Sequence, residues 1–372
     1  MTNKEALIVL NMLAGVGPIR VRQMLLSFSD PQSILNASVN DLCQVQGIGP
    51  KIAENINDWQ NMVDLQKELS LLEQYGIDVI TYMDEGYPDL LKEISDPPLL
   101  LYCKGNLSLL KECKDHSLAV VGSRRTSSYG EKMTENLVRA ASMAGWIIIS
   151  GLARGIDTFA HQQTLKQDGY TIAVLGGGLL EVYPYENKQL AAEIAVNGLV
   201  ISEQPLTMKP DKRTFPMRNR IVAGMSMGTL VIEAGSNSGS IITATKAKEM
   251  GKRVFAVPGR ADSALSQGCH TLIKEGAKLT ESLDDIVKEF TVLPGFEKFS
   301  DLEPIQTLAP KVVIPLNQDE QKIVELLEAT ELSMDDIVNK SGIGISQCLT
   351  LLMSMELKRI VRQLPGKRFT LK

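Results

Sequence analysis

The stretch that decides the fold is Leu118-Ala119-Val120-Val121-Gly122-Ser123-Arg124-Arg125. Its apolar start, partly β-branched, predicts a short buried strand. Gly122 lets the backbone turn, and Ser123 offers a hydroxyl and an N–H at that turn. Arg124 adds a planar set of donors suited to phosphate oxygens. Because a helical pattern begins near Ser128, we expect backbone donors and a helix N-terminus to face an anion here; the alternative is a plain turn with Arg124 in solvent.

Residues 115–290 continue this strand–turn–helix pattern. Short apolar runs are separated by helical patterns of roughly ten to fifteen residues, which predicts a Rossmann-like, doubly wound parallel sheet. The carboxyl ends of parallel strands share one edge, where open α/β sheets bind ligands, so the glycine-containing and polar turns after these runs predict a ligand site. The predicted strands are Leu118–Val121, Trp146–Ile149, Ile172–Leu175, Leu199–Ile201, Leu230–Ile232 and Val254–Val257.

Composition limits the classes of function. The 372-residue chain is long enough for about two or three domains, and its formal net charge of −5 excludes a broadly basic nucleic-acid coat, so any nucleic-acid site must be a local patch. The five cysteines form no Cys-x-x-Cys pair, which favours free thiols in a reducing cytosol over metal ligands or disulfides. Because the sequence has no membrane-length apolar run and no signal peptide, we expect a cytoplasmic protein with no membrane partner.

Residues 1–65 are predicted to form a small helical domain of the helix-hairpin-helix (SAM-like) type. Two turns, Gly15-Val16-Gly17-Pro18 and Gly47-Ile48-Gly49-Pro50, are flanked by apolar residues at helical spacing. The amides of such turns can hold a DNA phosphate, but acidic residues outnumber basic ones here, and duplex binding depends on neutralising phosphates. We therefore favour packing or protein contact over DNA binding for this domain.

Residues 66–114 read as an extension of the α/β domain, whose predicted bounds are 66–290. They contain an amphipathic helical pattern, a predicted strand at Val79–Tyr82, and a further apolar run at Leu99–Tyr102 that follows a proline-containing stretch. Residues 291–315 contain prolines and no periodicity, which predicts a linker.

Residues 316–372 show three helical patterns followed by a hairpin pattern, which predicts a winged-helix-like domain. Its third helix, Ile345–Leu357, has Glu356 as its only charge, so we expect a protein contact or weak phosphate contact rather than sequence-specific DNA reading.

Several common ligand classes are excluded by absent motifs. The first turn has no Gly-x-Gly-x-x-Gly, and the second apolar run ends in Ser150-Gly151 rather than in an acid that would bind a ribose, so a dinucleotide site is not expected. The P-loop motif is also absent. None of the three histidines lies beside a nucleophile elbow, so a hydrolytic triad is not expected either.

The stretch most informative about the ligand is Lys209-Pro210-Asp211-Lys212-Arg213-Thr214-Phe215-Pro216-Met217-Arg218-Asn219-Arg220-Ile221. It places five cations against one acid, with Phe215 among them. Cations that follow phosphates and a ring that stacks a base are what single-stranded nucleic acid requires. The alternative is a solvated basic loop with a buried Phe215. Asn219 either contacts a base edge or caps its own turn.

The motifs of the α/β region occur in a characteristic order. Gly122-Ser123-Arg124 is followed by Ser150–Asp157 with Ala160-His161, then by Phe215–Ile221, Ser238-Gly239-Ser240 and Ala256-Val257-Pro258-Gly259. In these motifs the chain resembles the DNA-processing protein A (DprA/Smf) family, and its terminal segments also suit that family.

The resemblance implies a bacterial cytosolic protein that binds single-stranded DNA and helps load the recombinase RecA during natural transformation or recombination. It also implies a homodimer formed through the α/β domain, without enzymatic activity, metal or cofactor. The residues that the motifs and the resemblance assign to nucleic-acid binding are Gly122, Ser123, Arg124, Gly151, Lys212, Phe215, Arg218, Asn219 and Arg220.

Three loops depart from the family pattern. Leu180 and His270 stand where the family usually has Asp and Asn, and Tyr185-Glu186 stand where relatives often have a basic residue. The competing class is an enzyme of the phosphoribohydrolase (lysine-decarboxylase-like) type, which needs a Pro-Gly-Gly-x-Gly-Thr-x-x-Glu turn; the corresponding loop here is Ala234–Ser240. Glu203 and Glu233 would be its carboxylates, although a role in bracing loops or contacting a base is favoured.

Overall fold

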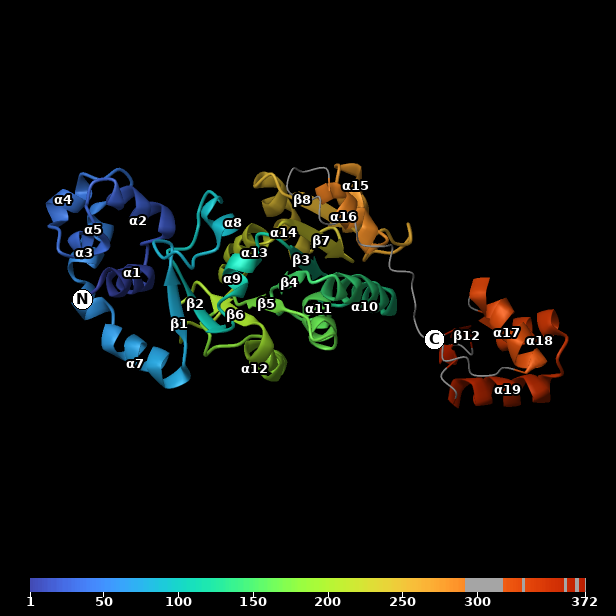
Figure 1. The fold of residues 1–372 in the computed structure, drawn as a ribbon. Coiled ribbons are helices and arrows are strands. Elements are labelled where there is room, and N and C mark those ends of the chain that lie inside the picture. Colours follow the sequence, from blue (N-terminus) through green and yellow to red (C-terminus); the bar gives the residue numbers. More distant parts are fainter. Residues whose placement is uncertain (292–316, 330–331, 358–359, 365–367, 372) are drawn as a thin grey trace. The chain divides into compact units, whose positions relative to one another are not determined.

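The computed structural model describes residues 1–291, 317–329, 332–357, 360–364 and 368–371 (Figure 1). The chain divides into two units, Met1–Ser300 and Asp301–Lys372. The predicted linker, apart from residue 291, lies outside the described residues. Among the described residues, no helix combines the length and apolar character needed to cross a bilayer, and no group of His, Cys, Asp and Glu side chains is arranged to hold a metal ion.

The first unit is built on a nine-stranded sheet whose strand order is β1-β2-β6-β5-β4-β3-β7-β8-β9. All six strands predicted for residues 115–290 are present, with bounds within two residues of those expected, and the strand predicted upstream at Val79–Tyr82 is present as well. The strands are β1 (Asp78–Thr81), β2 (Leu100–Gly105), β3 (Ser117–Gly122), β4 (Ile147–Ser150), β5 (Thr171–Val174), β6 (Leu199–Ser202), β7 (Gly228–Ile232), β8 (Arg253–Ala256) and β9 (Lys278–Leu279).

The strand order reverses at β3. β3 pairs in parallel with β4 on one side and with β7 on the other, with Leu118 opposite Gly228 and Gly122 opposite Ile232. All neighbours from β6 to β9 are parallel, whereas β1 and β2 add two antiparallel strands beyond β6. The carboxyl ends of β3 and β7 therefore form the switch point of a doubly wound sheet, which is where such sheets bind ligands. The predicted fold class is confirmed.

Helices cover both faces of this sheet (Figure 1). One face packs against α10 (Ser128–Met143), α11 (Ile156–Leu165) and α16 (Leu283–Thr291), and the apolar core between them includes Val120, Ile148 and Val138. The other face packs against helices from both halves of the domain, with Ala119, Ile149 and Ile221 in the core. These helices are α8 (Asp89–Lys92), α9 (Leu109–Glu112), α13 (Thr214–Met225), α14 (Gly239–Glu249) and α15 (Gln267–Lys274).

The N-terminal helices form the predicted helix-hairpin-helix unit and join the core of the sheet at its β6–β2 end. Gly15 and Gly47 adopt positive φ angles of 82° and 86°, which a turn can demand only of glycine at low cost. Arg20 donates to both of their carbonyl oxygens, at 2.7 and 3.3 Å, and so ties the two hairpin turns together. The helices of this unit are α1 (Asn3–Met12), α2 (Pro18–Leu25), α3 (Pro31–Leu35), α4 (Val39–Cys43), α5 (Pro50–Asn57) and α6 (Trp59–Met62). The amphipathic helix predicted after them is α7 (Leu65–Tyr75).

The second unit has the predicted winged-helix order. Its three-stranded sheet has the order β10-β12-β11, and a separate core gathers Ile323, Ile337, Leu352 and Phe369. On α19 the side chains of Ile345 and other apolar residues are exposed, in keeping with the nearly uncharged helix that the sequence shows. The elements are α17 (Gln318–Ala329), β10 (Leu332–Ser333), α18 (Met334–Ser341), α19 (Ile345–Leu357), β11 (Val361–Leu364) and β12 (Arg368–Leu371).

Candidate nucleic-acid interface

The turn after β3 is fixed by close backbone packing. A Cβ atom at Gly122 would overlap the carbonyl oxygen of Ile232, so the two central strands can approach as they do only with glycine here. The Ser123 hydroxyl accepts from the amide of Arg125 at 3.1 Å and donates to its carbonyl oxygen at 2.9 Å. Ser123 is buried and closes the turn, whereas Arg124 is exposed at its tip.

The N-terminus of α10 does not face an external anion, so that expectation from the sequence is wrong. The carboxylate of Glu233 accepts from the Ser127 amide at 2.9 Å, from the Thr126 hydroxyl at 3.0 Å, and from the Ser127 hydroxyl. Glu233 follows β7 across the switch point and has a positive φ of 52°, a strained conformation for a residue other than glycine. The helix dipole is thus satisfied by a carboxylate of the chain itself.

Arg124 and Phe215 come together at the carboxyl edge of the sheet. The guanidinium carbon of Arg124 lies 5.5 Å from the centroid of the Phe215 ring, within cation–π range. Phe215 lies in the first turn of α13 and is half-buried against Gly176, where a Cβ atom would lie 3.0 Å from the ring. A small pocket of about 40 Å³ opens beside them, lined by Arg124, Gly151, Ala153, Arg154, Tyr183, Pro184, Phe215 and Arg218.

Arg218 is buried beneath this pocket and holds the loop after β4. Its guanidinium donates to the carbonyl oxygens of Gly151 and Val174, and its Nε donates to the Asn219 side chain at 3.1 Å. Burial lowers the pKa of Arg218 to about 10, an effect that the nearby Asp157 carboxylate opposes. A Cβ atom at Gly151 would overlap the Arg218 guanidinium, which explains why glycine is needed there.

Asp157 completes the same loop from the other side. Its carboxylate accepts from the amides of Gly151 and Ala153 at 3.1 and 3.4 Å. Burial raises the pKa of Asp157. The positive charge of Arg218 acts to lower this pKa, but its effect is smaller than that of burial. The carbonyl oxygen of Gly151 is therefore fixed by a buried cation, and its amide by a buried carboxyl group.

The cations of residues 209–220 do not form one patch. Lys209 and Lys212 are exposed, and Arg213 is exposed but paired with Asp211 at 3.0 Å. Arg220 is buried and pairs with Asp96 at 2.9 Å and with Glu203, and the Asn219 side chain donates to the Gly239 carbonyl at 3.4 Å.

The pairing of Arg220 also defines the environment of Glu203. Burial raises the pKa of Glu203, an effect that Arg220 opposes. Glu203 pairs with Arg220, and Glu233 accepts from the start of α10. Both carboxylates that the alternative enzyme hypothesis requires are therefore engaged in contacts that stabilise the fold.

Four residues of the pocket were not among the predicted site residues: Ala153, Arg154, Tyr183 and Pro184. The ring of Tyr183 lies 5.6 Å from that of Phe215, and Arg154 is paired with Glu186 at 2.5 Å and 3.0 Å. The signal for Tyr183 was the Tyr-Pro sequence after the third strand, which marks an aromatic residue in a strand-end loop. Of the departures from the family pattern, Leu180 packs against the core and His270 lies with its Nε2 atom 3.0 Å from the Gly259 carbonyl oxygen.

Together, a doubly wound sheet with a cation–aromatic pocket at its switch-point edge, a helix-hairpin-helix unit and a winged helix define a multidomain Rossmann-like protein. Comparison with known families gives the same division. The model described as DNA recombination-mediator protein A matches residues 78–291, the DprA winged helix domain matches 308–367, and the SAM-like helix-hairpin-helix tandem matches 7–57. The chain belongs to the DNA-processing protein A (DprA/Smf) family.

Individual relatives agree with this assignment. The chain is 33% identical to protein Smf of Synechocystis over 95% of each chain, and 46% identical to DNA processing protein DprA of Streptococcus pneumoniae over 61% of this chain and 77% of that one. The X-ray structure of DprA from Streptococcus pneumoniae superposes with a TM-score of 0.67 and 37% identity, covering 78% of this chain and 98% of that chain.

A second solved structure bears on the ligand. DNA processing protein A from Helicobacter pylori, whose structure is described as giving insight into a unique single-stranded DNA binding mode, superposes with a TM-score of 0.53 and 29% identity. It covers 59% of this chain and 97% of that chain.

Proposed function

We propose that the protein binds single-stranded DNA at the carboxyl edge of its sheet and helps to load RecA onto it. The observation that supports this most directly is Arg124 lying 5.5 Å over the Phe215 ring beside a small pocket. A cation for the phosphate and a ring for the base, side by side, are the parts of a single-strand site. The Helicobacter pylori relative adds support, since the described binding mode of that protein is for single-stranded DNA.

The roles within this proposed site follow from exposure. Arg124 and Lys212 are exposed and would contact phosphates, and Phe215 would stack a base. Gly122, Ser123 and Gly151 shape the two loops so that a backbone can approach closely. Arg218, Asn219 and Arg220 are positioning residues in this proposal, because their side chains are engaged with the protein itself.

The family also motivates a homodimer and the partnership with RecA. The sheet ends at β9, a short strand whose residues are exposed, with Leu279 42% exposed. A free parallel edge of this kind invites pairing with another chain. We propose that two copies associate through the α/β domain, so that two DNA sites lie in one assembly.

Fluorescence anisotropy with labelled single-stranded and double-stranded oligonucleotides across a salt series tests the DNA part of this proposal. We expect tighter binding of the single strand, little dependence on sequence, and an affinity that falls with salt. Equal affinity for the duplex would rule out the stacking site. The RecA part is tested separately, by measuring whether the protein accelerates RecA filament formation on single-stranded DNA coated with a single-strand-binding protein.

A further inference from the structure

Two exposed arginines line the small pocket at the carboxyl edge of the sheet, and they come from different loops. Arg124 is at the tip of the turn after β3, and Arg154 is in the loop between β4 and α11. These loops pack together, because the Ile156 amide donates to the Ser123 carbonyl oxygen at 3.2 Å and a Cβ atom at Gly155 would overlap that oxygen. The function proposed above gives a phosphate to Arg124 and leaves Arg154 without a role.

Arg154 faces Glu186 because two elements are tied together beneath them. The buried side chain of Asn187 donates to the Leu152 carbonyl oxygen at 2.9 Å and to the Thr158 hydroxyl at 2.8 Å. These bonds hold the short 3₁₀ helix that carries Glu186 against the loop that carries Arg154. The two charged side chains therefore meet from fixed positions at the rim of the pocket.

Arg154 and Glu186 form a two-point ion pair that is open to solvent. Nε of Arg154 donates to one carboxylate oxygen at 2.5 Å, and Nη2 donates to the other at 3.0 Å. The side chains are 58% and 53% exposed, and the hydrogen bonding from Arg154 lowers the pKa of Glu186, so this carboxylate is ionised at neutral pH. An exposed pair contributes little to stability. A phosphate, which offers two oxygens in a similar arrangement, can therefore replace Glu186 at low cost.

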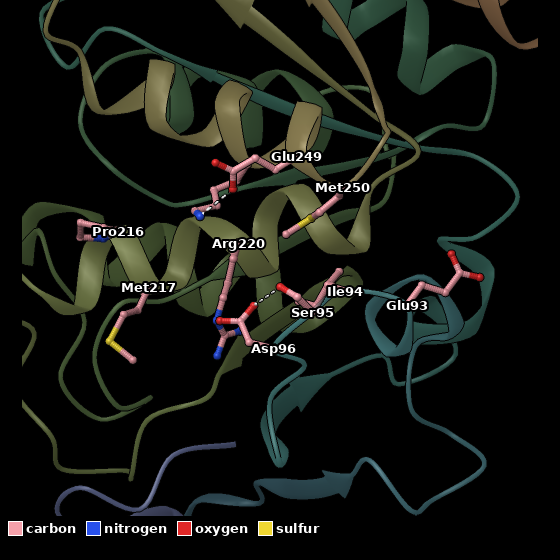
Figure 2. Close-up of a pocket in the computed structure, with 10 residues that line it drawn as sticks. Glu93, Ile94, Ser95, Asp96, Pro216, Met217, Arg220, Glu249 and Met250 are labelled. Carbon is pink, nitrogen blue, oxygen red and sulfur yellow. Dashed lines mark hydrogen bonds and ion pairs between the residues drawn. The ribbon is translucent and has the colours of Figure 1, made fainter. Parts of the chain in front are cut away.

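The arginine of the larger cavity, of about 550 Å³, is not free to change partners in this way. Figure 2 shows Arg220 beside Asp96, with which it pairs at 2.9 Å. Arg220 also pairs with Glu203, and the side chains of these two residues are 6% and 7% exposed. Breaking a buried pair leaves an uncompensated charge and is strongly destabilising. The difference in exposure makes Arg154, and not Arg220, the arginine that can accept a phosphate.

Tyr183 supplies a second aromatic ring next to Phe215. The two ring centres are 5.6 Å apart, and the ring planes are inclined by 47°. A base held between two rings needs them about 7 Å apart, twice a contact distance of about 3.5 Å, so no base fits between these two. Tyr183 is 50% exposed and lines the same pocket as Arg154. Phe215 and Tyr183 therefore offer separate surfaces to two different bases.

We propose that Arg154 and Tyr183 form a second nucleotide position beside the one at Arg124 and Phe215, and that Glu186 is the counter-ion that DNA displaces from it. Arg154 exchanges the Glu186 carboxylate for a phosphate of the strand, and Tyr183 stacks the next base. The inference rests on the function proposed above and gives the strand a direction. Its path runs from the turn after β3 towards the loops after β4 and β5, and not towards those after β7 and β8.

Fluorescence anisotropy of the full-length protein with labelled oligothymidine across a salt series tests the exchange. Glu186→Gln removes the competing carboxylate and should tighten binding about twofold to fivefold, which corresponds to the strength of an exposed ion pair. The slope of log affinity against log salt should steepen by up to about 0.7, the effect of one further phosphate on a single strand. Glu249→Gln breaks an exposed pair with Lys246 on α14, at 2.8 Å, and is the matched control that should change neither quantity. Unchanged affinity in Glu186→Gln would overturn the exchange.

A double-mutant cycle separates direct contact from general repulsion. Arg154→Gln should weaken oligothymidine binding about threefold to tenfold, the strength of a charged hydrogen bond less that of the exposed pair. It should also abolish the gain from Glu186→Gln, because the freed arginine is then missing. If the gain persists in the Arg154→Gln background, Glu186 only repels the strand at a distance and the proposal is wrong.

The stacking role of Tyr183 has its own test. Tyr183→Leu should weaken binding about tenfold, within the range for one stacked base, and Tyr183→Phe should restore it. Tyr170→Leu changes an exposed tyrosine directly before β5, at the opposite end of that strand, and is the matched control. Equal affinity of the two leucine variants, both unfolding at the wild-type temperature, would remove the second base from the site.

Arg124→Ala in the same series distinguishes this inference from the function on which it rests. If Arg124→Ala weakens binding while Arg154→Gln and Tyr183→Leu bind like the wild type, the second nucleotide position is wrong and the DNA site stands. If the wild type shows no preference for single-stranded DNA, both proposals fail together.

Discussion

The guanidinium carbon of Arg124, at the tip of the turn after β3, lies 5.5 Å from the centre of the Phe215 ring at the start of α13. These residues are far apart in the chain and meet only because β3 ends, and α13 after β6 begins, at the same edge of the sheet. The contact leaves each group with exposed surface, since Arg124 is exposed and Phe215 is half-buried. Each can therefore be changed separately and its contribution measured.

Arg124→Ala should weaken single-stranded DNA binding by a similar factor on every sequence tested. Loss of one phosphate contact should also reduce the slope of log affinity against log salt by about one, or slightly less on a single strand. Anisotropy titrations at several salt concentrations measure both quantities. Lys132→Ala removes an exposed cation on α10 and is the control; an equal effect of the two substitutions would show that only overall charge matters.

Phe215→Leu separates a stacking role from a packing role, because leucine keeps apolar volume and loses the ring. We expect unchanged thermal stability and an affinity loss of about 1–3 kcal/mol, the contribution of one stacked base. Phe215→Tyr should restore binding. Intact affinity in a well-folded leucine variant, or a lower unfolding temperature without loss of affinity, would assign Phe215 to the core instead.

Glu233→Gln should destabilise the fold. It should not change the cleavage of nucleoside monophosphates, because we expect no such activity in the wild type. The carboxylate caps α10 through Thr126 and Ser127, and losing a charged cap of this kind costs about 1–2 kcal/mol. Denaturant unfolding measures the loss. The enzyme alternative makes the opposite forecast: wild type would cleave a nucleoside monophosphate, and the variant would be folded and inactive.

Deletion of residues 316–372 should leave the dissociation constant for single-stranded DNA within a few-fold. The winged helix has its own core, and its third helix presents exposed Ile345, Leu349 and Met353 instead of cations. Binding to phosphates requires cations, so this helix contributes little to it. A loss as large as that of Arg124→Ala would place part of the DNA site in the second unit.

His161 should make the protein less stable in acid. Its ring is fully buried, Nδ1 lies 2.7 Å from the Thr171 hydroxyl, and burial lowers the pKa of His161 to about 3. In the unfolded chain His161 has a pKa near its ordinary 6.5, so between pH 6.5 and 3 it binds a proton that it does not bind in the folded protein. The contribution of His161 to stability is therefore complete above pH 6.5 and falls as the pH drops from there towards 3.

The size of this effect is measurable. Between pH 7 and pH 5 it amounts to about 2 kcal/mol, at 1.36 kcal/mol per pKa unit. Urea unfolding of wild type and His161→Gln at both pH values isolates it, since other titrating groups contribute equally to both proteins. His116→Gln serves as the control. The same pH dependence in all three proteins would assign the acid sensitivity to other groups.

The sequence was sufficient to predict the strands and the edge where their loops meet, because short apolar runs and glycines have few alternatives. It did not predict which charges face outward. Arg218 and Arg220 are separated by one residue in a basic stretch, yet both are buried, one against backbone carbonyls and the other between Asp96 and Glu203. Their partners lie on distant segments, so no local pattern reveals them.

The same limit explains the start of α10. The strand–turn–helix pattern led us to expect a bound anion at the first turn of this helix, because its unpaired amides attract negative charge. The anion is Glu233, whose proximity depends on β7 pairing with β3. Only the strand order shows that a residue so far along the chain reaches this turn.

The clamp on the loop after β4 has a thermodynamic consequence. Arg218 and Asp157 hold the carbonyl and the amide of Gly151 from opposite sides through contacts within the chain itself. A ligand that arrives there does not have to freeze the loop, so it loses less conformational entropy than it would at a disordered segment. Association at this edge should therefore proceed without a slow rearrangement, in a single phase whose rate rises in proportion to ligand concentration.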